Sequence, residues 1–206
     1  MNLSLSSTSS ALQKRGYETL VCASGAEAAE AVAREMADAR IVGFGGSMTI
    51  SSLGLQERAK ALGKEVLIHG DPSLSPERKM EVMRGELTCD LFLLSANAMT
   101  ADGVNVNIDG NGNRDAASIF GPKRVVYVVG RNKIVDGGIE DAIARVKREA
   151  SPPNCRRLNR RTPCAATGEC ADCSSPDRIC HVTAIFDRCP RRTSTLVILV
   201  DEDLGY

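Results

Sequence analysis

Short apolar runs alternate with longer segments of helical composition along most of the chain. Such runs are typical of a parallel sheet that is covered on both faces, where every residue of a strand is buried. Strands are predicted at Thr19–Cys22, Ile41–Phe44, Glu65–Ile68, Asp90–Leu94, Arg124–Val129 and Thr195–Val200. Helices are predicted at Leu3–Lys14, Gly25–Asp38, Leu53–Leu62, Ser75–Glu86, Arg114–Phe120 and Gly138–Glu149. This order indicates an α/β fold with a mostly parallel open sheet and helices on both faces.

Two later stretches interrupt this order. Apolar and polar residues alternate strictly over Val104–Asp109, which predicts a half-exposed strand paired as a hairpin with Asp90–Leu94. The sequence SPPN at 151–154 predicts the end of the preceding helix, because proline removes a helical hydrogen-bond donor. The apolar run Thr195–Val200 then predicts a return to the sheet. We therefore expect one domain over residues 1–206, with residues 152–192 inserted before the last strand.

The overall charge is balanced, with 26 Lys and Arg against 26 Asp and Glu among 206 residues. Proteins that follow a nucleic-acid backbone normally carry a basic excess, and base stacking needs aromatic side chains, which make up only 3% here. We therefore expect no nucleic-acid partner. No apolar run approaches the ~20 residues of a membrane helix, and the polar start Met1–Ser10 lacks the regions of a signal peptide. We expect a cytoplasmic protein without a membrane span.

A glycine-rich loop follows the predicted strand Ile41–Phe44 and precedes a predicted helix. This arrangement presents free backbone N–H groups to an anion, and neighbouring hydroxyl groups add further donors. The candidate ligand-binding residues of this loop are Gly45, Gly46, Ser47, Met48 and Thr49. The loop is neither a Walker A motif nor a complete dinucleotide fingerprint. A tight turn in which Ser47 caps the following helix is the structural alternative.

Two further polar clusters follow predicted strands, and ligand sites of open α/β sheets lie at the carboxyl ends of strands. The first cluster contributes the candidate residues Asn97, Thr100, Asp102, Gly103, Asn107, Asp109, Gly110, Asn113 and Arg114. The second contributes Asn132 and Lys133. Because Asn and Asp are also ordinary turn residues, turns without a ligand are the alternative. The two histidines, His69 and His181, lie outside these clusters and are interpreted as surface or protein-partnered side chains.

Cysteines are concentrated near the C-terminus. Of the eight, Cys22 and Cys89 stand alone and are interpreted as small buried apolar residues. The other six fall between Cys155 and Cys189, a density that in a chain of this length favours metal ligation over a disulfide framework. Residues 152–192 also include few large apolar side chains, so we expect the binding energy of a metal to order this segment.

The predicted metal ligands are a Cys-x-x-Cys pair and one cysteine on either side of it: Cys164, Cys170, Cys173 and Cys180. Four thiolates suit either Zn²⁺ or a [4Fe–4S] cluster, and the spacing does not decide between them. Cys155 and Cys189 fall outside this motif, as spare thiols or as one replacement ligand. Reduced thiols, or a disulfide without a metal, are the alternative.

Three stretches carry a resemblance to a known family: GFGGSMTISSLGL from Gly43, CDLFLLSANAMTADGVNVNIDGNGNRDAASIFGPKRVVYVVGRNKIV from Cys89, and TPCAATGECADCSSPDRIC from Thr162. Over Gly16–Tyr206 the chain resembles the lactate-utilisation family, also called the LUD-domain or DUF162 family. The fold of that family is similar to the fold of glucosamine-6-phosphate deaminases, ribose-5-phosphate isomerases and CoA transferases. Those proteins bind phosphorylated sugars, CoA esters or related anions at their strand ends.

The resemblance implies a domain that binds a small anionic metabolite and acts in or beside a redox assembly, with iron–sulfur partner proteins, for 2-hydroxy-acid oxidation. It does not imply activity of the isolated domain. Asn97 stands where an Asp is expected in the isomerases, and their carboxylate and lysine acid–base set has no clear counterpart. A stand-alone isomerase or transferase acting on a phosphorylated sugar or acyl-CoA is one alternative, and a non-catalytic metal-knuckle interaction module is another. The oligomeric state, including a homo-oligomer, stays open.

The leading interpretation has one structural requirement. The glycine loop would hold the anion, the side chains from Asn97 to Arg114 would orient it, and Asn132 and Lys133 would close the rim. We therefore expect these stretches to line one shared cavity.

Overall fold

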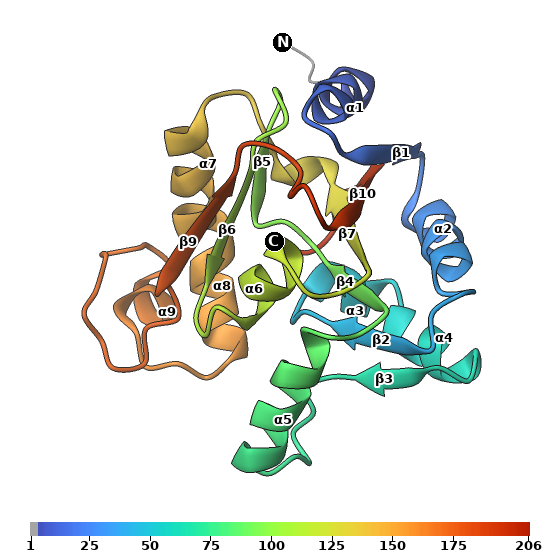
Figure 1. Ribbon diagram of the computed structural model, residues 1–206. Helices are drawn as coiled ribbons and strands as arrows, with labels where there is room; N and C mark the ends of the chain where they lie inside the picture. The colour runs from blue at the N-terminus through green and yellow to red at the C-terminus, as the bar shows by residue number, and fades with distance from the viewer. Residues whose placement is uncertain (1–3) are drawn as a thin grey trace.

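The computed structural model describes residues 4–206 and contains two β-sheets (Figure 1). The first residue of the predicted N-terminal helix, Leu3, lies outside the described residues. In the main sheet six strands are parallel, in the order β1-β10-β7-β4-β2-β3. Their bounds are β1 Glu18–Cys22, β2 Ile41–Phe44, β3 Glu65–Leu67, β4 Leu91–Leu94, β7 Arg124–Gly130 and β10 Ser194–Val200. The α/β fold with a mostly parallel sheet is confirmed.

Apart from α8 and α9, which were not predicted, the helices agree with the predicted segments at most of their positions. Their bounds are α1 Leu5–Lys14, α2 Gly25–Glu35, α3 Met48–Ser52, α4 Leu55–Ala61, α5 Pro76–Glu86, α6 Asn113–Ile119, α7 Ile139–Arg145, α8 Ser151–Arg157 and α9 Pro163–Thr167. The predicted helix Leu53–Leu62 is in fact two helices, α3 and α4. They are separated by Gly54, whose φ of 63° lies in the left-handed region that interrupts a helix.

The central strands explain why their sequences are apolar at every position. In β7, Val126 and Val128 face one core cluster, while Val125, Tyr127 and Val129 face another. The first cluster packs under α2, α3 and α4, and the second lies under α1 and α6. Burial on both faces removes any need for polar positions in the strand.

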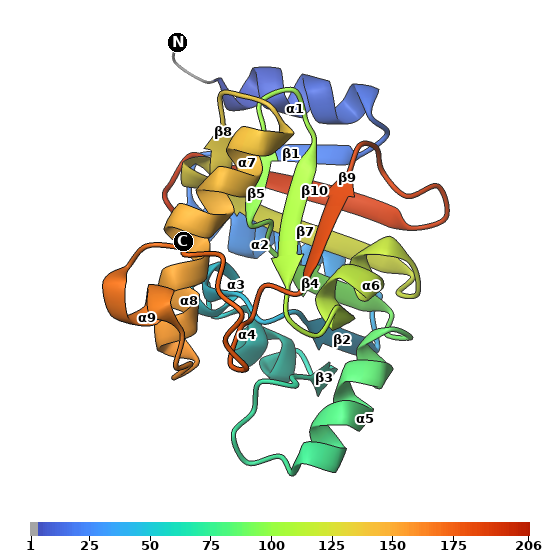
Figure 2. The same ribbon diagram turned by 90° about the vertical axis from the view of Figure 1, so that its left-hand side faces the viewer.

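A second sheet covers part of the main sheet, and the sequence did not predict it. It has four strands in the order β8-β5-β6-β9, with bounds β5 Ala98–Thr100, β6 Asn105–Asp109, β8 Ile134–Val135 and β9 Val182–Phe186. One side of this sheet packs on the main sheet through Met99, and the other packs on α7 through Ala98 and Val106. Figure 2 shows α7 lying against this sheet on the side away from the main sheet.

The prediction for Val104–Asp109 was therefore wrong in two respects. The strand β6 pairs antiparallel with β5, not with β4. It is also buried along most of its length, because α7 and the main sheet cover its two faces. The polar residues Asn105 and Asn107, which suggested an exposed face, are 1% and 0% exposed. Their carboxamide groups lie inside the molecule.

The expected helix end at residues 151–154 was also wrong. The chain continues from α7 through a π-helical turn, Val146–Ala150, directly into α8. Pro152 and Pro153 lie in the first turn of α8, where a helix has unbonded N–H groups and a missing donor costs little. The altered hydrogen bonding of a π turn therefore accommodates both prolines within one long helical segment.

The last strand, β10, lies between β1 and β7 in the middle of the main sheet. The segment before it is more ordered than its composition suggested. It contains α8, α9 and β9, and β9 pairs antiparallel with β6 along five residues. Burial therefore orders part of this segment, with Cys155 at 1% and Cys164 at 6% exposure.

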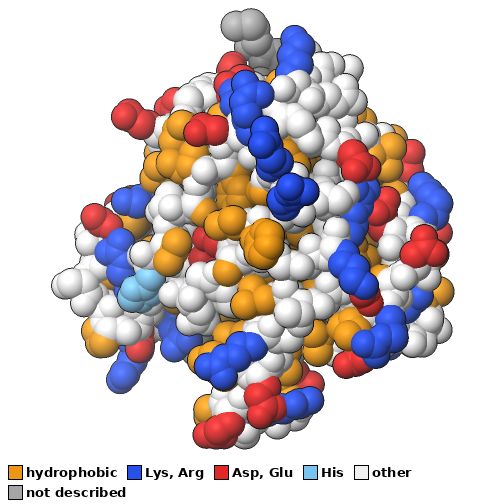
Figure 3. Space-filling view, in the orientation of Figure 1, with side chains coloured by type: hydrophobic (Ala, Val, Ile, Leu, Met, Phe, Trp, Pro, Cys, Tyr) orange, Lys and Arg blue, Asp and Glu red, His pale blue; other side chains and the backbone are white. Residues whose placement is uncertain are grey.

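The surface shows no broad patch of one charge on the face in Figure 3. Acidic and basic side chains are interspersed there, apart from a row of Lys and Arg side chains that runs from beside α1 toward the centre. Among residues 4–206, no helix combines the length and apolar character needed to cross a membrane.

Candidate functional site

Three adjacent parallel strands of the main sheet, β2, β4 and β7, end at the same edge. A cavity of about 580 Å³ lies at this edge. It extends to the end of β6, to α8 and to the segment 176–181, so both sheets and the cysteine segment contribute to it. The predicted residues that line the cavity are Gly46, Ser47, Met48, Asn97, Asp109, Gly110, Asn113, Arg114 and Lys133. The glycine loop and the cluster from Asn97 to Arg114 therefore lie around one space.

The glycine loop contributes shape more than hydrogen-bond donors. The backbone N–H of Gly45 donates to Leu93 O at 2.9 Å, which ties the loop to β4. Ser47 caps α3, and its Oγ accepts from Ile50 N at 3.3 Å. A helix of only five residues provides little dipole to attract an anion. Gly45 leaves room for a neighbour, because a Cβ there would lie 3.1 Å from Cγ of Arg114.

That neighbour, Arg114, is a buried cation at the cavity wall. It is 9% exposed, and its Nη2 donates to Asn97 Oδ1 at 2.8 Å and to Ile108 O at 3.0 Å. Its Nε has no hydrogen-bond partner among the described residues. Asp109 does not neutralise it, since Asp109 Oδ2 accepts from the backbone N–H groups of Arg114 and Asp115 at the start of α6. The buried Asp115 carboxyl group lies near enough for the charge of Arg114 to lower its pKa against the larger raising effect of burial, but no carboxylate among the described residues forms an ion pair with the guanidinium group.

Lys133 is a second buried basic side chain, located just after β7. It is 3% exposed, and its Nζ donates to Thr49 Oγ1 and to Ser95 Oγ, both at 2.9 Å. No carboxylate lies within ion-pair distance of it in the part of the chain that the structure describes. Burial lowers the pKa of Lys133 to about 7, and the nearby charges of Arg145 and Arg114 contribute to the shift.

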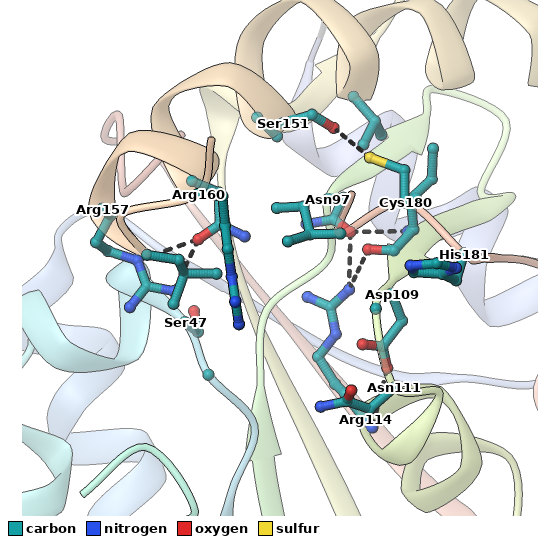
Figure 4. Close-up of a pocket in the computed structure, with 18 of the residues that line it drawn as sticks. Ser47, Asn97, Asp109, Asn111, Arg114, Ser151, Arg157, Arg160, Cys180 and His181 are labelled. Carbon is teal, nitrogen blue, oxygen red and sulfur yellow. Dashed lines mark hydrogen bonds between the residues drawn. The ribbon is translucent and has the colours of Figure 1, made fainter. Parts of the chain in front are cut away.

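Further cations reach the cavity from elements that no sequence pattern connected with it. Figure 4 shows Arg157 and Arg160 on the side of Ser47, facing Arg114 and Asp109 across the cavity. Lys79 and Arg178 also line it. The only sequence signal for the arginines was their high density after residue 155, which fits solvated side chains equally well.

Both histidines line the same cavity. His69 follows β3, and its Nδ1 lies 2.7 Å from Oε1 of Glu86, a side chain with no exposed surface. Such a carboxylate fixes the orientation of the imidazole ring and leaves Nε2 free. A Cβ on Gly46 would lie 3.8 Å from that Nε2, so the free nitrogen is beside the glycine loop. Of the two alternatives expected for the histidines, a surface or a protein-partnered side chain, His69 is the second, and it also borders the candidate site. His181 Nε2 lies 2.9 Å from Arg178 O.

Comparison with known proteins assigns the family. The model of the LUD domain matches residues 5–200, which is nearly the whole chain. The chain belongs to the LUD-domain family. A crystal structure of a DUF162 family protein from Deinococcus radiodurans is similar in fold, with a TM-score of 0.54 and 17% sequence identity over 94% of this chain and 95% of that one. Among curated proteins, no sequence matches the chain significantly.

Several predicted residues of this LUD domain do not line the cavity. Thr100, Asp102 and Gly103 lie at the far end of β5, beside α1, where Asp102 forms a 2.6 Å ion pair with Arg15. The side chain of Asp102 is 66% exposed. Strand β5 runs antiparallel to β6, so its carboxyl end points away from the amino end of α6. The polar cluster is therefore divided between two ends of a hairpin.

The remaining predicted residues have supporting roles. Asn107 Oδ1 accepts from the backbone N–H of Asn97 at 2.9 Å and so positions a residue that lines the cavity. Asn132 binds the C-terminal segment, since its Oδ1 accepts from Leu204 N at 3.1 Å and its Nδ2 donates to Gly205 O at 3.2 Å. Neither Gly45 nor Thr49 lines the cavity. Gly45 lies beside the side chain of Arg114, and Thr49 Oγ1 accepts from Nζ of Lys133.

The four predicted metal ligands do not form a metal-holding group among the described residues of this LUD domain, although Cys180 lies near enough to Cys164 and Cys170 to interact with them electrostatically. Within residues 4–206, no group of three or more His, Cys, Asp or Glu side chains is arranged to hold a metal ion. The closest thiols are Cys155 and Cys164, with 3.7 Å between their sulfur atoms, and Cys155 was not among the predicted ligands. Cys170 is exposed, while Cys180 lines the cavity and donates to Ser151 Oγ at 3.4 Å. With the side chains in these positions, the thiols do not surround one zinc ion or one [4Fe–4S] cluster, and ligation by these cysteines stays a prediction.

Proposed function

We propose that this LUD domain binds a small organic anion, such as a 2-hydroxy acid or a 2-oxo acid, in the cavity between its two sheets. The observation that carries the proposal is the charge of the cavity wall. Five cationic side chains line it, Lys79, Arg114, Arg157, Arg160 and Arg178, together with the amine of Lys133, against the two carboxylates of Asp109 and Asp177. Among the described residues, only Arg178 of these six side chains forms an ion pair, with Asp172. An anion would supply the missing negative charge.

The size of the cavity agrees with a small ligand. Small-molecule sites generally occupy about 300–1,000 Å³, and this cavity has about 580 Å³. The polar groups at its wall include the Asn97 carboxamide and backbone groups of the glycine loop, which could fix the orientation of a carboxylate. By analogy with the lactate-utilisation name of the family, we place the domain in or beside a redox assembly that oxidises 2-hydroxy acids.

Arg114→Gln tests the binding proposal. Loss of a charged hydrogen-bond donor costs about 1.5–3 kcal/mol, so we expect the Kd for pyruvate or lactate to rise about 10- to 150-fold, measured by titration calorimetry. Arg131→Gln is the matched control, because Arg131 is 55% exposed and pairs with Asp201 and Asp203 outside the cavity. Unchanged affinity in a folded Arg114→Gln protein would exclude the site.

A second candidate is a stand-alone isomerase that moves a proton on a phosphorylated sugar. The observation that favours it is the His69–Glu86 pair, because a carboxylate-oriented imidazole is a common general base. Its test is the exchange of substrate C–H hydrogens with D₂O, followed by NMR with ribose 5-phosphate as the probe. We expect His69→Gln to reduce the exchange rate about 10²-fold or more. Exchange that is equally fast in this variant would exclude His69 as the base.

A further inference from the structure

The hydrogen bonds of Lys133 suit a neutral amine. Thr49 Oγ1 donates its hydrogen to Leu204 O at 2.9 Å, and Ser95 Oγ donates its hydrogen to Ala96 O at 3.3 Å. Each hydroxyl therefore has only acceptor capacity left for Lys133. The Lys133 nitrogen donates to both, which uses the two N–H groups of a neutral amine. The third hydrogen-bonding site of the Lys133 nitrogen, which is a lone pair when the amine is neutral, has no partner among the described residues.

The surroundings of Lys133 favour the same state. The side chain is almost completely buried, and the two charged groups near it, Arg145 and Arg114, are cations. Arg145 is itself held in place, because its Nη1 donates to Asn97 O at 2.7 Å and its Nε and Nη2 donate to Asn132 O. Lysines in such desolvated, positively charged surroundings are known nucleophiles toward carbonyl groups.

We propose that Lys133 forms an imine with the carbonyl carbon of a bound anion that carries a ketone or aldehyde group. The inference rests on the proposed anion-binding function and narrows the ligand to this chemical class. Arg114, from the adjacent wall, would hold the carboxylate or phosphate while the amine of Lys133 attacks the carbonyl. The two hydroxyl groups beside the amine would keep its lone pair oriented during the attack.

The step balances without an external oxidant or reductant. The nitrogen lone pair forms a C–N bond, and the C=O π electrons move to oxygen, giving a carbinolamine after a proton passes from nitrogen to oxygen. The second amine hydrogen then leaves with that hydroxyl group as water, and a C=N bond remains. A protonated imine withdraws electrons from the neighbouring C–H or C–C bond, which is how lysine imines assist proton transfer and bond cleavage.

Reductive trapping tests the inference on the whole chain. The protein is incubated at neutral pH with pyruvate or with dihydroxyacetone phosphate in the presence of cyanoborohydride, and the modified peptide is identified by mass spectrometry. The two probes distinguish a carboxylate from a phosphate ligand. We expect one adduct per chain, on Lys133, formed more than about tenfold faster than on exposed lysines, because far more of its amine is uncharged. Lactate, which has no carbonyl group, should give no adduct.

Two variants complete the test. Lys133→Met should abolish the fast adduct, while Lys60→Met, which removes a lysine that pairs with Glu57 outside the cavity, should leave it unchanged. The position of the adduct in the wild-type peptide map answers the question even if Lys133→Met does not fold. Pyruvate binding without an adduct on Lys133 would overturn the imine and leave the proposed function intact. Absence of both binding and adduct, with both probes, would overturn the two proposals together.

Discussion

In this cavity, burial determines whether a basic side chain keeps its proton, and the neighbouring residues in the sequence do not. Arg114 and Lys133 are both almost fully buried, and neither has a carboxylate partner within residues 4–206. Arginine keeps its proton under such conditions, whereas lysine loses it readily. The wall of the cavity therefore combines one permanent charge with one amine that titrates near neutral pH.

The lowered pKa of Lys133 predicts a pH-dependent stability. The pKa is 10.5 for an ordinary lysine and about 7 in the folded protein, so between these values the unfolded chain holds a proton that the folded one has released. The free energy of unfolding should therefore rise with pH across this window. Below about pH 7 both states hold the proton, and the full cost of burying a charged Lys133 lowers the stability of the folded protein. We expect Lys133→Met to be more stable than the wild type by ~2 kcal/mol below pH 7, with the difference shrinking toward pH 10.

Urea unfolding at a series of pH values measures this difference. The two groups that accept hydrogen bonds from the amine are the hydroxyls of Thr49 and Ser95, which do not ionise in this pH range, so the change can be assigned to Lys133. Lys79→Met serves as the control, with no pH-dependent difference expected. A stability difference that stays constant with pH would contradict a lowered pKa in the folded protein.

At the scale of elements, the helical segment from α7 to α8 determines how much positive charge the cavity has. A helix that ended at residue 151 would have left Arg157 in a loop. The π-helical turn instead carries the helix past Pro152 and Pro153, and Arg157 becomes the last residue of α8, at the cavity wall. A one-turn change in hydrogen bonding thus decides which side chains can reach the cavity. Single π turns are frequently found at functional sites.

The β2–α3 loop gives a matched pair of glycine substitutions. In Gly45→Ala the new Cβ would lie 3.1–3.3 Å from Arg114 side-chain carbons and 3.2 Å from Leu94 Cβ, which displaces the guanidinium group. We expect a loss of ~1–3 kcal/mol in stability through overpacking, and weaker binding of pyruvate. Gly46→Ala borders the cavity but meets only His69 Nε2 at 3.8 Å, an ordinary contact. Thermal unfolding and calorimetry compare the two, and equal effects would contradict this packing of Arg114.

At the scale of the molecule, the cavity depends on two sheets that meet at an angle in Figure 1. The main sheet contributes the ends of β2, β4 and β7, and the second sheet contributes the end of β6. The cysteine segment closes the remaining side through residues 176–181. Parts of the chain more than 130 residues apart, from Gly46 to Cys180, therefore line one space.

Hydrogen exchange can test this joint contribution. Pyruvate at about 100 times its Kd should slow local opening about 100-fold, because the ligand binds only the closed site. Mass spectrometry measures the exchange. We expect simultaneous protection of three segments: the β2–α3 loop, Asp109–Arg114 and residues 176–181. Strand β1, which is remote from the cavity, is the internal control. Protection limited to one of the three segments would contradict a ligand held between the two sheets.

The sequence alone determined the strands of the main sheet. A strand that is buried on both faces has apolar residues at every position, and the runs at 124–129 and 195–200 show this pattern. The sequence also identified the glycine loop and the residues from Asn97 to Arg114 as candidates, since their types and their position after strands are local properties. The sequence could not predict two spatial relationships between distant residues. Whether Asp102 shares a site with Asp109 depends on the direction of β5, and whether Arg157 reaches the glycine loop depends on a helix passing two prolines.

Only the tertiary structure decided these points, together with the burial of Lys133 and the positions of the cysteine side chains. The physical reason is the same in each case. The periodic pattern of apolar and polar residues along a chain indicates which residues are buried, because buried positions recur at regular intervals and are apolar. It does not record which distant segment covers that residue, and the charge state of a lysine or the geometry of a thiol cluster depends on that segment.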